Sequence, residues 1–437
     1  MKRFFETLRN IWSIEDLRKR IFNTLGLLFI YRLGSFVVLP GIDAEILQQT
    51  NGDAQGLAQL INIFAGGAFS RASIFALGIM PYISASIVMQ LAGIAIPRIQ
   101  KMQREGESGR RKVTQWTRYL TIIVTLLQGS TYIGTQIPPE AIVTTSPWMF
   151  KFTSLIILIT GTLFVMWLGE RITDKGIGNG TSLIIMIGII ATFPTALVAE
   201  FETRLNGVGG SVFFLLEIVF LLIVILASVM LVQGTRRVPV QYAKRVVGKM
   251  QTAGGRNFLP LKVNASGVMP IIFASTIMVI PPTLFSSNNT VMTMFSNPFG
   301  FGYNLTLGIL IIAFTYFYTA IVFSPQQIAE EMKKNGGFIP GVKPGKRTAE
   351  FLDNILSRIT LPGSIFLAIV AIFPAFAYLL GVSPNFALFF GGTSLLIMVG
   401  VILDTLQQIE SHLLMKRYDG LMKGGKIKGR SSLPVMG

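Results

Sequence analysis

LAQLINIFAGGAFSRASIFALGIMPYISASIVMQL, residues 57–91, is an apolar run that Gly66-Gly67 and the polar pair Ser70-Arg71 interrupt in its first half. The part before the interruption is too short to cross a bilayer, which takes about 20 helical residues. We expect it to be re-entrant or folded into the protein interior, because irregular backbone at membrane depth must be covered by protein or by a water-filled cavity. An interfacial helix is the alternative, and the residues alone favour neither.

The run continues into a full apolar span from residue 73, and nine further spans of similar length follow or precede it. Hydrophobic residues make up 51% of the 437, charged residues only 14%, and the mean hydropathy is +0.60, which excludes an ordinary soluble chain. We therefore predict an all-α polytopic membrane protein. Its ten transmembrane helices are expected at residues 21–40, 73–96, 119–136, 152–169, 181–199, 211–233, 265–285, 305–325, 360–381 and 386–408.

Basic residues alternate between the segments that connect these spans. Of the 38 Lys and Arg residues, 34 lie in the two termini and every second connection, whereas the other connections hold only Arg71 and Arg204. Positive charge marks the cytoplasmic side, so both termini are predicted to be cytoplasmic. The first apolar stretch runs the full width of a bilayer and has no small-residue cleavage site, so we expect a retained span and not a cleaved signal peptide. The basic segments are residues 1–20, 98–118, 170–182, 234–263, 326–360 and 411–437.

Five spans fall in each half of the chain. An odd number of spans per half gives the two halves opposite orientations, so a shared fold makes them an inverted repeat. We predict an N-terminal half, residues 1–205, and a C-terminal half, residues 206–437, which ends in a basic tail. Inverted repeats place a pathway at their interface, near the middle of the bilayer.

Two of the basic connections are longer than topology requires. Residues 234–263 hold seven basic residues and no acid, and the alternation of Arg237-Val-Pro-Val-Gln-Tyr indicates a strand or short hairpin. Residues 326–360 combine mixed charges with the tip GGFIPGVKPGK, residues 336–346. Such loops favour a protruding platform for an acidic or RNA-containing partner over a merely solvated loop.

The chain carries few groups that suit catalysis or ion coupling. It has no cysteine, its single histidine, His412, follows the last span, and only Glu217 and Asp404 are acids within the spans. The glycines of 176–180 join two spans and lack the βα unit of a phosphate site, and residues 106–112 lack nucleotide-site spacing. We predict a protein that is not an enzyme and binds no cofactor or metal.

What remains is a set of spans with many small and aliphatic residues, which suits a pore that yields around a polymer and resists ions by dewetting. Two other classes stay open at this point. A secondary transporter with a 5+5 repeat would need polar half-helices and ion ligands at mid-membrane. An insertase or scaffold would bind ribosomes without a pore.

Several long motifs point to one family. With like order and spacing over essentially the whole chain, they resemble the SecY family, whose members form the central subunit of the bacterial protein-conducting channel. The motifs are GGAFSRASIFALGIMPYISASIVMQL (66–91), EGESGRRK (105–112), WLGERITDKGIGNGTSLII (167–185), QYAKR (241–245), LPLKVNASGVMPIIFAS (259–275), FYTAIVFSP (317–325) and GGTSLLIMVGVILD (391–404).

The resemblance implies two pseudo-symmetric halves around an hourglass pore, with a plug that closes the pore from the trans side. The segment from Leu57 to Ser73 matches the plug, which the resemblance favours over an interfacial helix. Its residues include Ile61, Phe64, Gly66, Gly67, Ser70 and Arg71. The positions that match the aliphatic pore ring are Ile79, Ile83, Ile185, Ile272 and Ile397.

The resemblance also implies a lateral gate between spans 2 and 3 and spans 7 and 8, through which signal sequences and nascent membrane helices leave for the lipid bilayer. Ser84 and Gln128 match polar gate positions, whereas the third position is the apolar Ile280. The long loops match a docking surface for the motor ATPase SecA and the ribosome. Its candidate residues are Arg236, Arg237, Lys244, Arg245, Lys249, Lys343 and Arg347.

One docking position departs from the family's pattern. Lys343 stands where an arginine is usual, and it keeps the charge but loses bidentate contacts. The resemblance further implies the membrane subunits SecE and SecG, association with SecDF and YidC, and a location in the bacterial inner membrane. Because the chain has no nucleotide site, SecA or the ribosome is expected to supply the energy.

Overall fold

The computed structural model is built almost entirely of helices. It describes residues 12, 14–51, 57–143, 146–206, 210–242, 246–247, 250–251, 256–264, 266–284 and 297–423. Within these ranges ten helices have 16 to 34 residues, and each coincides with one of the ten predicted spans. Six are long and apolar enough to cross a membrane on their own, and there are seven if the pair Met80–Ala95 and Pro97–Gln103, bent by 104°, counts as one span. The prediction of an all-α polytopic membrane protein is confirmed.

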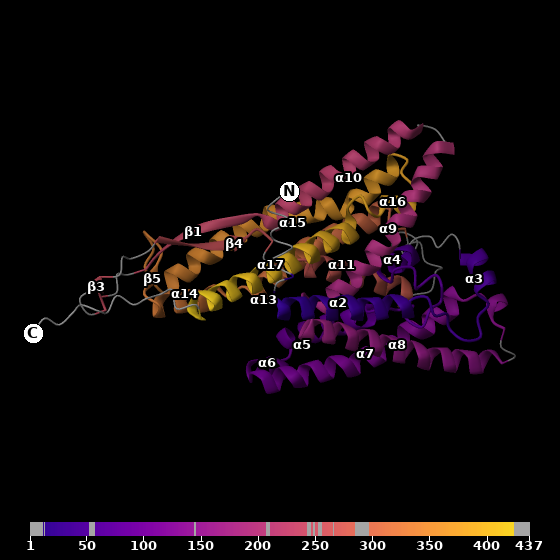
Figure 1. The fold of residues 1–437 in the computed structure, drawn as a ribbon, viewed down its shortest axis with the longest axis horizontal. Coiled ribbons are helices and arrows are strands. Elements are labelled where there is room, and N and C mark those ends of the chain that lie inside the picture. Colours follow the sequence, from indigo (N-terminus) through magenta and orange to yellow (C-terminus); the bar gives the residue numbers. More distant parts are fainter. Residues whose placement is uncertain are drawn as a thin grey trace, which may run out of the picture.

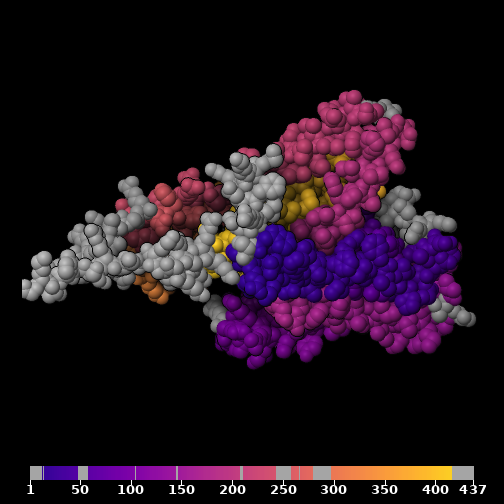
Figure 2. All heavy atoms as spheres, viewed as in Figure 1, coloured from indigo at the N-terminus to yellow at the C-terminus, as the bar shows by residue number. Residues whose placement is uncertain are grey.

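The helices of the N-terminal half lie together on one side of the bundle (Figure 1). α2 packs against α8 and α9, and α5, α7 and α8 pack on one another in turn. Figure 2 shows α2 and the segment after it as an indigo band across one face of the molecule. The bounds are α2 Glu15–Gly34, α5 Met80–Ala95, α7 Glu107–Gln136, α8 Pro147–Lys175 and α9 Gly180–Asn206.

The C-terminal half contributes five helices that pack mainly on one another. α13 and α15 pack together, and α17 contacts α9, α10, α11 and α15, so it joins this half to the end of the first. Contact between α5 and α11 closes the bundle on another side. The bounds are α10 Gly210–Gln233, α11 Met269–Leu284, α13 Phe301–Val322, α15 Lys346–Leu379 and α17 Gly392–Lys423.

Short helices cap the two ends of the bundle. The interior helix α4 and the short helices α3 and α16 lie toward one end, and α6 and α14 lie toward the other, which also carries the strands (Figure 1). The chain bends by 104° between α5 and α6, where Ile96 is extended because a residue before proline avoids the helical region. The bounds are α3 Ala44–Asn51, α4 Leu57–Phe64, α6 Pro97–Arg104, α14 Pro325–Lys334 and α16 Pro384–Ala387.

Several predicted span boundaries are wrong. The second span begins at Met80 rather than 73, because residues 73–79 are turns buried in the protein, and the first ends at Gly34 rather than 40. The last span begins at Gly392 rather than 386, since α16 and a turn come before it. Two spans start early: α7 at Glu107 and α15 at Lys346. Apolar composition alone does not distinguish a spanning helix from buried irregular backbone.

α7 contains buried threonines whose hydroxyl groups are bonded within the helix itself. Thr117, Thr121 and Thr125 are buried, and each hydroxyl donates to the carbonyl four residues earlier, over 2.9, 2.8 and 2.7 Å. No partner outside the helix is needed, so these side chains are tolerated where water is absent. The glycine-rich turn 176–180 joins α8 to α9 as predicted, and a Cβ at Gly180 would overlap the Gly169 carbonyl.

The two long loops form a three-stranded sheet and a separate pair of short strands. β1 (Thr235–Tyr242) pairs antiparallel with β4 (Arg256–Lys262) and with β5 (Gly337–Phe338), and β2 (Val246–Val247) pairs with β3 (Met250–Gln251). The strand predicted at Arg237 is therefore confirmed. Alternate side chains of β1 point into a separate hydrophobic core, as the twofold period of a strand requires. That core contains Val238, Val240, Leu261, Met332, Ile339 and Leu352.

Candidate functional site

Aliphatic side chains from both halves meet in the middle of the bundle. The five isoleucines that match the family's pore ring are 1–7% exposed and belong to one hydrophobic cluster. They come from the start of α5, from α9, α11 and α17, so both halves contribute. We call this group the waist: Ile79, Ile83, Ile185, Ile272 and Ile397.

A cavity of about 390 Å³ opens onto this waist from the end of the bundle that carries the basic loops. Three isoleucines, Ile83, Ile185 and Ile272, form part of its wall, whereas Ile79 and Ile397 do not line it. The remaining wall is largely polar. Arg118 forms a two-pronged ion pair with Glu170 there, at 3.1 and 2.7 Å. The wall of the cavity is therefore aliphatic where it meets the waist and mostly polar elsewhere, and we call this polar part its mouth.

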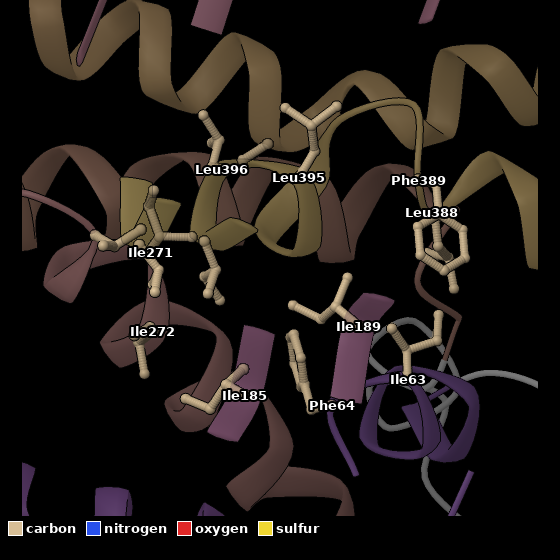
Figure 3. Close-up of a cluster of buried hydrophobic side chains, with 14 of the residues drawn as sticks. Ile63, Phe64, Ile185, Ile189, Ile271, Ile272, Leu388, Phe389, Leu395 and Leu396 are labelled. Atoms are coloured by element: carbon tan, nitrogen blue, oxygen red, sulfur yellow. The ribbon is translucent and has the colours of Figure 1, made fainter. Parts of the chain in front are cut away.

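The opposite side of the waist is covered by the segment 57–73, which we call the plug segment. Ile63 and Phe64 at the end of α4 are 6% and 7% exposed, and Figure 3 shows them beside Ile185 and Ile189 of α9. Leu388 and Phe389, which follow α16, belong to the same buried cluster. The plug segment thus lies in the protein interior, one of the two positions that the interrupted apolar run left open and the one that the family resemblance favoured.

Glycines allow the plug segment to approach α9 closely. Gly66 and Gly67 have φ of 66° and 82°, a region that side-chain-bearing residues rarely adopt. A Cβ at Gly188 of α9 would overlap the Phe64 carbonyl oxygen, so the two backbones are in direct contact. Ile61 and Ser70 are half-buried, and the Ser70 amide donates to the Asn62 side chain over 3.0 Å.

Side chains of α2 and α7 hold the turn that follows α4. Arg32 and Arg71 both donate to the Gly66 carbonyl, over 3.1 and 3.0 Å, and both guanidinium groups lie over the Phe36 ring. Burial first, and then the neighbouring Arg32 charge, lower the pKa of Arg71 below its usual value. Tyr132 donates to the Phe69 carbonyl over 2.7 Å. These contacts fix backbone atoms rather than particular side chains.

The candidate gate residues lie on α5, α7 and α11, of which α5 and α11 join the two halves. Ser84 of α5 is buried and donates to the Met80 carbonyl over 3.1 Å, and Gln128 of α7 is half-buried. Ile280 belongs to α11, and its side chain lies outside the described part of the chain. The two halves meet here where α5 packs on α11.

The candidate docking residues that are described all lie at the surface. Arg236 and Arg237 are exposed at the start of β1, and Lys343 and Arg347 are exposed around the start of α15. Positive φ at Gly341 and Gly345 bends the chain on both sides of Lys343. The predictions for Lys244, Arg245 and Lys249 fall outside the described residues, as do most of the first basic segment and the tail after residue 423.

Sequence reasoning missed a buried ion cluster near the C-terminal end of α9. Arg204 pairs with both Glu200 and Glu217, and Glu200 is fully buried. Its signal was present in part, because Glu217 is an acid within a span and Arg204 is the only basic residue of its connection. Asp404 lines a second cavity of about 290 Å³, together with Lys262. His412 is half-buried, and no cluster of metal-binding side chains occurs among the described residues.

The protein is a polytopic helical bundle with an aliphatic waist, which has a polar cavity on one side and an interior segment that covers the other. These features define the class of gated membrane channels. The SecY family model matches residues 73–406. The chain belongs to the SecY family.

Curated relatives match it over nearly their whole length. The protein translocase subunit SecY of Chlamydia trachomatis is 42% identical and covers 97% of this chain and 99% of its own, and that of Escherichia coli is 40% identical over 95% and 96%. Among solved structures, one described as a protein conducting channel has a TM-score of 0.65 at 18% identity and covers 94% of this chain and 95% of its own. Sec61 in the canine ribosome-channel complex from the endoplasmic reticulum has a TM-score of 0.59 at 17% identity, over 94% and 95%.

Proposed function

We propose that this chain is the central subunit of a protein-conducting channel in the bacterial inner membrane. It passes unfolded secretory proteins across the membrane and releases hydrophobic segments sideways into lipid. The observation that carries the proposal is the waist, closed by aliphatic side chains between a polar cavity and the plug segment. Isoleucine offers no hydrogen bond to a passing chain, so the seal depends on fit and tolerates any sequence.

In this proposal the halves 1–205 and 206–437 move apart to open the pore, and a gate near Ser84, Gln128 and Ile280 opens between α5 and α11. A segment exposed there to lipid partitions by its own hydrophobicity, since leucine-like residues each gain a few tenths of a kcal/mol at the centre of a membrane helix. The channel performs no chemistry. A motor ATPase or the ribosome pushes the chain.

The docking surface is the small sheet with the tip around Lys343. Its separate hydrophobic core joins residues 234–263 to 326–360, which supports a rigid platform rather than two independent loops. Exposed arginines on such a platform suit the RNA of a ribosome or an acidic face of SecA. The described part of the platform and the basic segments share one end of the bundle, which supports cytoplasmic termini. SecE, SecG, SecDF and YidC are the proposed membrane partners.

The test is import into vesicles that hold the purified complex. With SecA and ATP present, a secretory precursor should become protected from protease, and a photocrosslinker at Ile185 should capture an arrested precursor. Vesicles with the complex but without ATP are the control. Capture without import would favour a scaffold or insertase, and transport of small solutes without precursor capture would favour a secondary transporter.

A further inference from the structure

The plug segment touches both halves of the molecule, but it does so through different kinds of contact. Toward the N-terminal half, side chains donate to its backbone: Tyr31 to the Ala65 carbonyl over 3.5 Å, Arg32 to Gly66, and Tyr132 to Phe69. The chain also pairs with itself on this side, since the Leu39 amide donates to the Ala72 carbonyl over 2.9 Å. We call this set the plug seat.

Toward the C-terminal half, the described plug segment makes one polar contact. Gln59 of α4 donates its amide to the side-chain oxygen of Asn385 in α16. Gln59 is 7% exposed, whereas Asn385 faces the trans side of the bundle and is exposed. The two residues are separated by 326 positions, so this bond joins the plug segment to a distant part of the C-terminal half.

A buried ion cluster fixes the position of α16. Glu200 accepts the Ser383 amide at 3.0 Å and the Arg204 guanidinium at 3.0 Å. Arg204 reaches in turn to Glu217 of α10 and donates to the Gly381 carbonyl over 2.8 Å. The cluster therefore joins the last helix of the first half, the first helix of the second, and the segment that carries Asn385. Because the Glu200 side chain is fully buried, its carboxylate oxygens have few donors to bond with other than Ser383 and Arg204.

We propose that the Gln59–Asn385 contact is a latch that holds the plug segment closed, and that Glu200 and Arg204 position its fixed end. The inference rests on the proposed channel function. When the halves separate, the latch breaks while the seat keeps the plug segment with the N-terminal half. One side-chain hydrogen bond is weak enough for an entering chain to overcome, because its loss shifts an equilibrium by only about two- to tenfold.

The first test is a double-mutant cycle on the resting ion conductance of the complete complex in planar bilayers. Gln59→Ala and Asn385→Ala should each raise the resting leak about two- to tenfold, and the double variant should leak no more than either alone. The reciprocal swap, Gln59→Asn with Asn385→Gln, should restore the seal. Tyr132→Phe removes a seat contact instead, so its effect should add to that of Asn385→Ala. Additive effects of the first pair would overturn the latch.

The second test exploits the absence of cysteine from the chain. In a Gln59→Cys, Asn385→Cys variant, a short thiol-to-thiol crosslinker should form the link at rest and stop precursor import, and a cleavable linker should restore import after cleavage. Equal import by linked and unlinked complexes would overturn the latch alone. If the unlinked complex imported nothing while the cysteine-free complex was equally inactive, the proposed function itself would be withdrawn.

The positioning role of Glu200 has its own readout. Ser383 has φ of −59°, which proline adopts, so Ser383→Pro deletes the amide donor to Glu200 without adding strain at that residue. The rate of crosslinking between positions 59 and 385 should fall, while the amount of folded complex stays unchanged. A matched Thr203→Ala variant alters an exposed hydroxyl that bonds only within α9, and it should leave the rate unchanged. An unchanged rate in Ser383→Pro would remove Glu200 from the latch.

Discussion

The waist and the plug seat lie next to each other, yet they are held by different interactions. The waist is a cluster of aliphatic side chains from both halves, with no directional contact among them. The plug seat consists of hydrogen bonds to the carbonyls of Ala65, Gly66, Phe69 and Ala72, and the backbone contact at Gly188 lies beside it. Aliphatic side chains can repack around any polypeptide that enters the waist, because they make no directional contacts. The hydrogen bonds of the plug seat, in contrast, hold the plug segment in one defined position.

The largest effect is expected from the buried ion cluster around Arg204, which holds the segment before α16. Arg204→Ala leaves Glu200 and Glu217 buried without their partner, and removing one member of a buried pair costs about 3–5 kcal/mol. Thermal unfolding of the detergent-solubilised complex should show a large fall in midpoint. Arg204→Lys keeps the charge with fewer contacts and should lose less. Equal stability of Arg204→Ala and the parent chain would show that the cluster does not support α16.

A polar residue in the waist tests the other member of the comparison. Ile185→Asn removes about 1.5–3 kcal/mol of apolar burial at a residue that is 3% exposed and puts a polar amide into the aliphatic seal, next to the polar cavity. The resting ion leak should rise about ten- to hundredfold in planar bilayers. A leak equal to that of the parent chain would show that the seal lies elsewhere.

The backbone contact between α9 and the plug segment is the next target. A Cβ at Gly188 would overlap the Phe64 carbonyl, and overpacking of a well-packed site costs about 1–3 kcal/mol, part of which a shift of the plug segment relieves. Gly188→Ala should therefore raise the resting leak about tenfold. Gly134→Ala is the matched control, because nothing lies within 4 Å of its added Cβ. Equal leaks in the two variants would mean that the plug segment does not need this close approach.

The same comparison explains what could be predicted from the sequence. Apolar spans and basic connections are local features of the sequence, so the ten helices and the alternation of basic and non-basic connections could be predicted. Burial of residues 57–69 could be predicted only as one of two alternatives, the other being an interfacial helix. The waist isoleucines are not distinguishable from other apolar residues by pattern, and only the family resemblance pointed to them. Their role as a ring remains a prediction.

The plug contacts were not predictable, because each joins residues far apart in the chain. Gln59 and Asn385 are ordinary polar residues at the edges of apolar stretches, and nothing local pairs them. Glu217 stands out in the sequence as an acid within a span, but its partner Arg204 is set by the packing of helices. Residues 73–79 are as apolar as a spanning helix, so composition predicts a helix where the structure has turns.

The smallest effect is expected from a change that preserves the volume of the waist. Ile272→Leu keeps the aliphatic surface at a residue that is 4% exposed, and volume-conserving swaps cost less than about 1.5 kcal/mol. If the seal depends on fit and not on residue identity, the leak should rise by no more than about twofold, and precursor import should match that of the parent chain. Ile272→Ser, of smaller volume and with a hydroxyl, is the control that should leak. A leucine variant that leaked as much as the serine variant would show that the waist is as specific in its contacts as the plug seat, and the difference between the two regions would disappear.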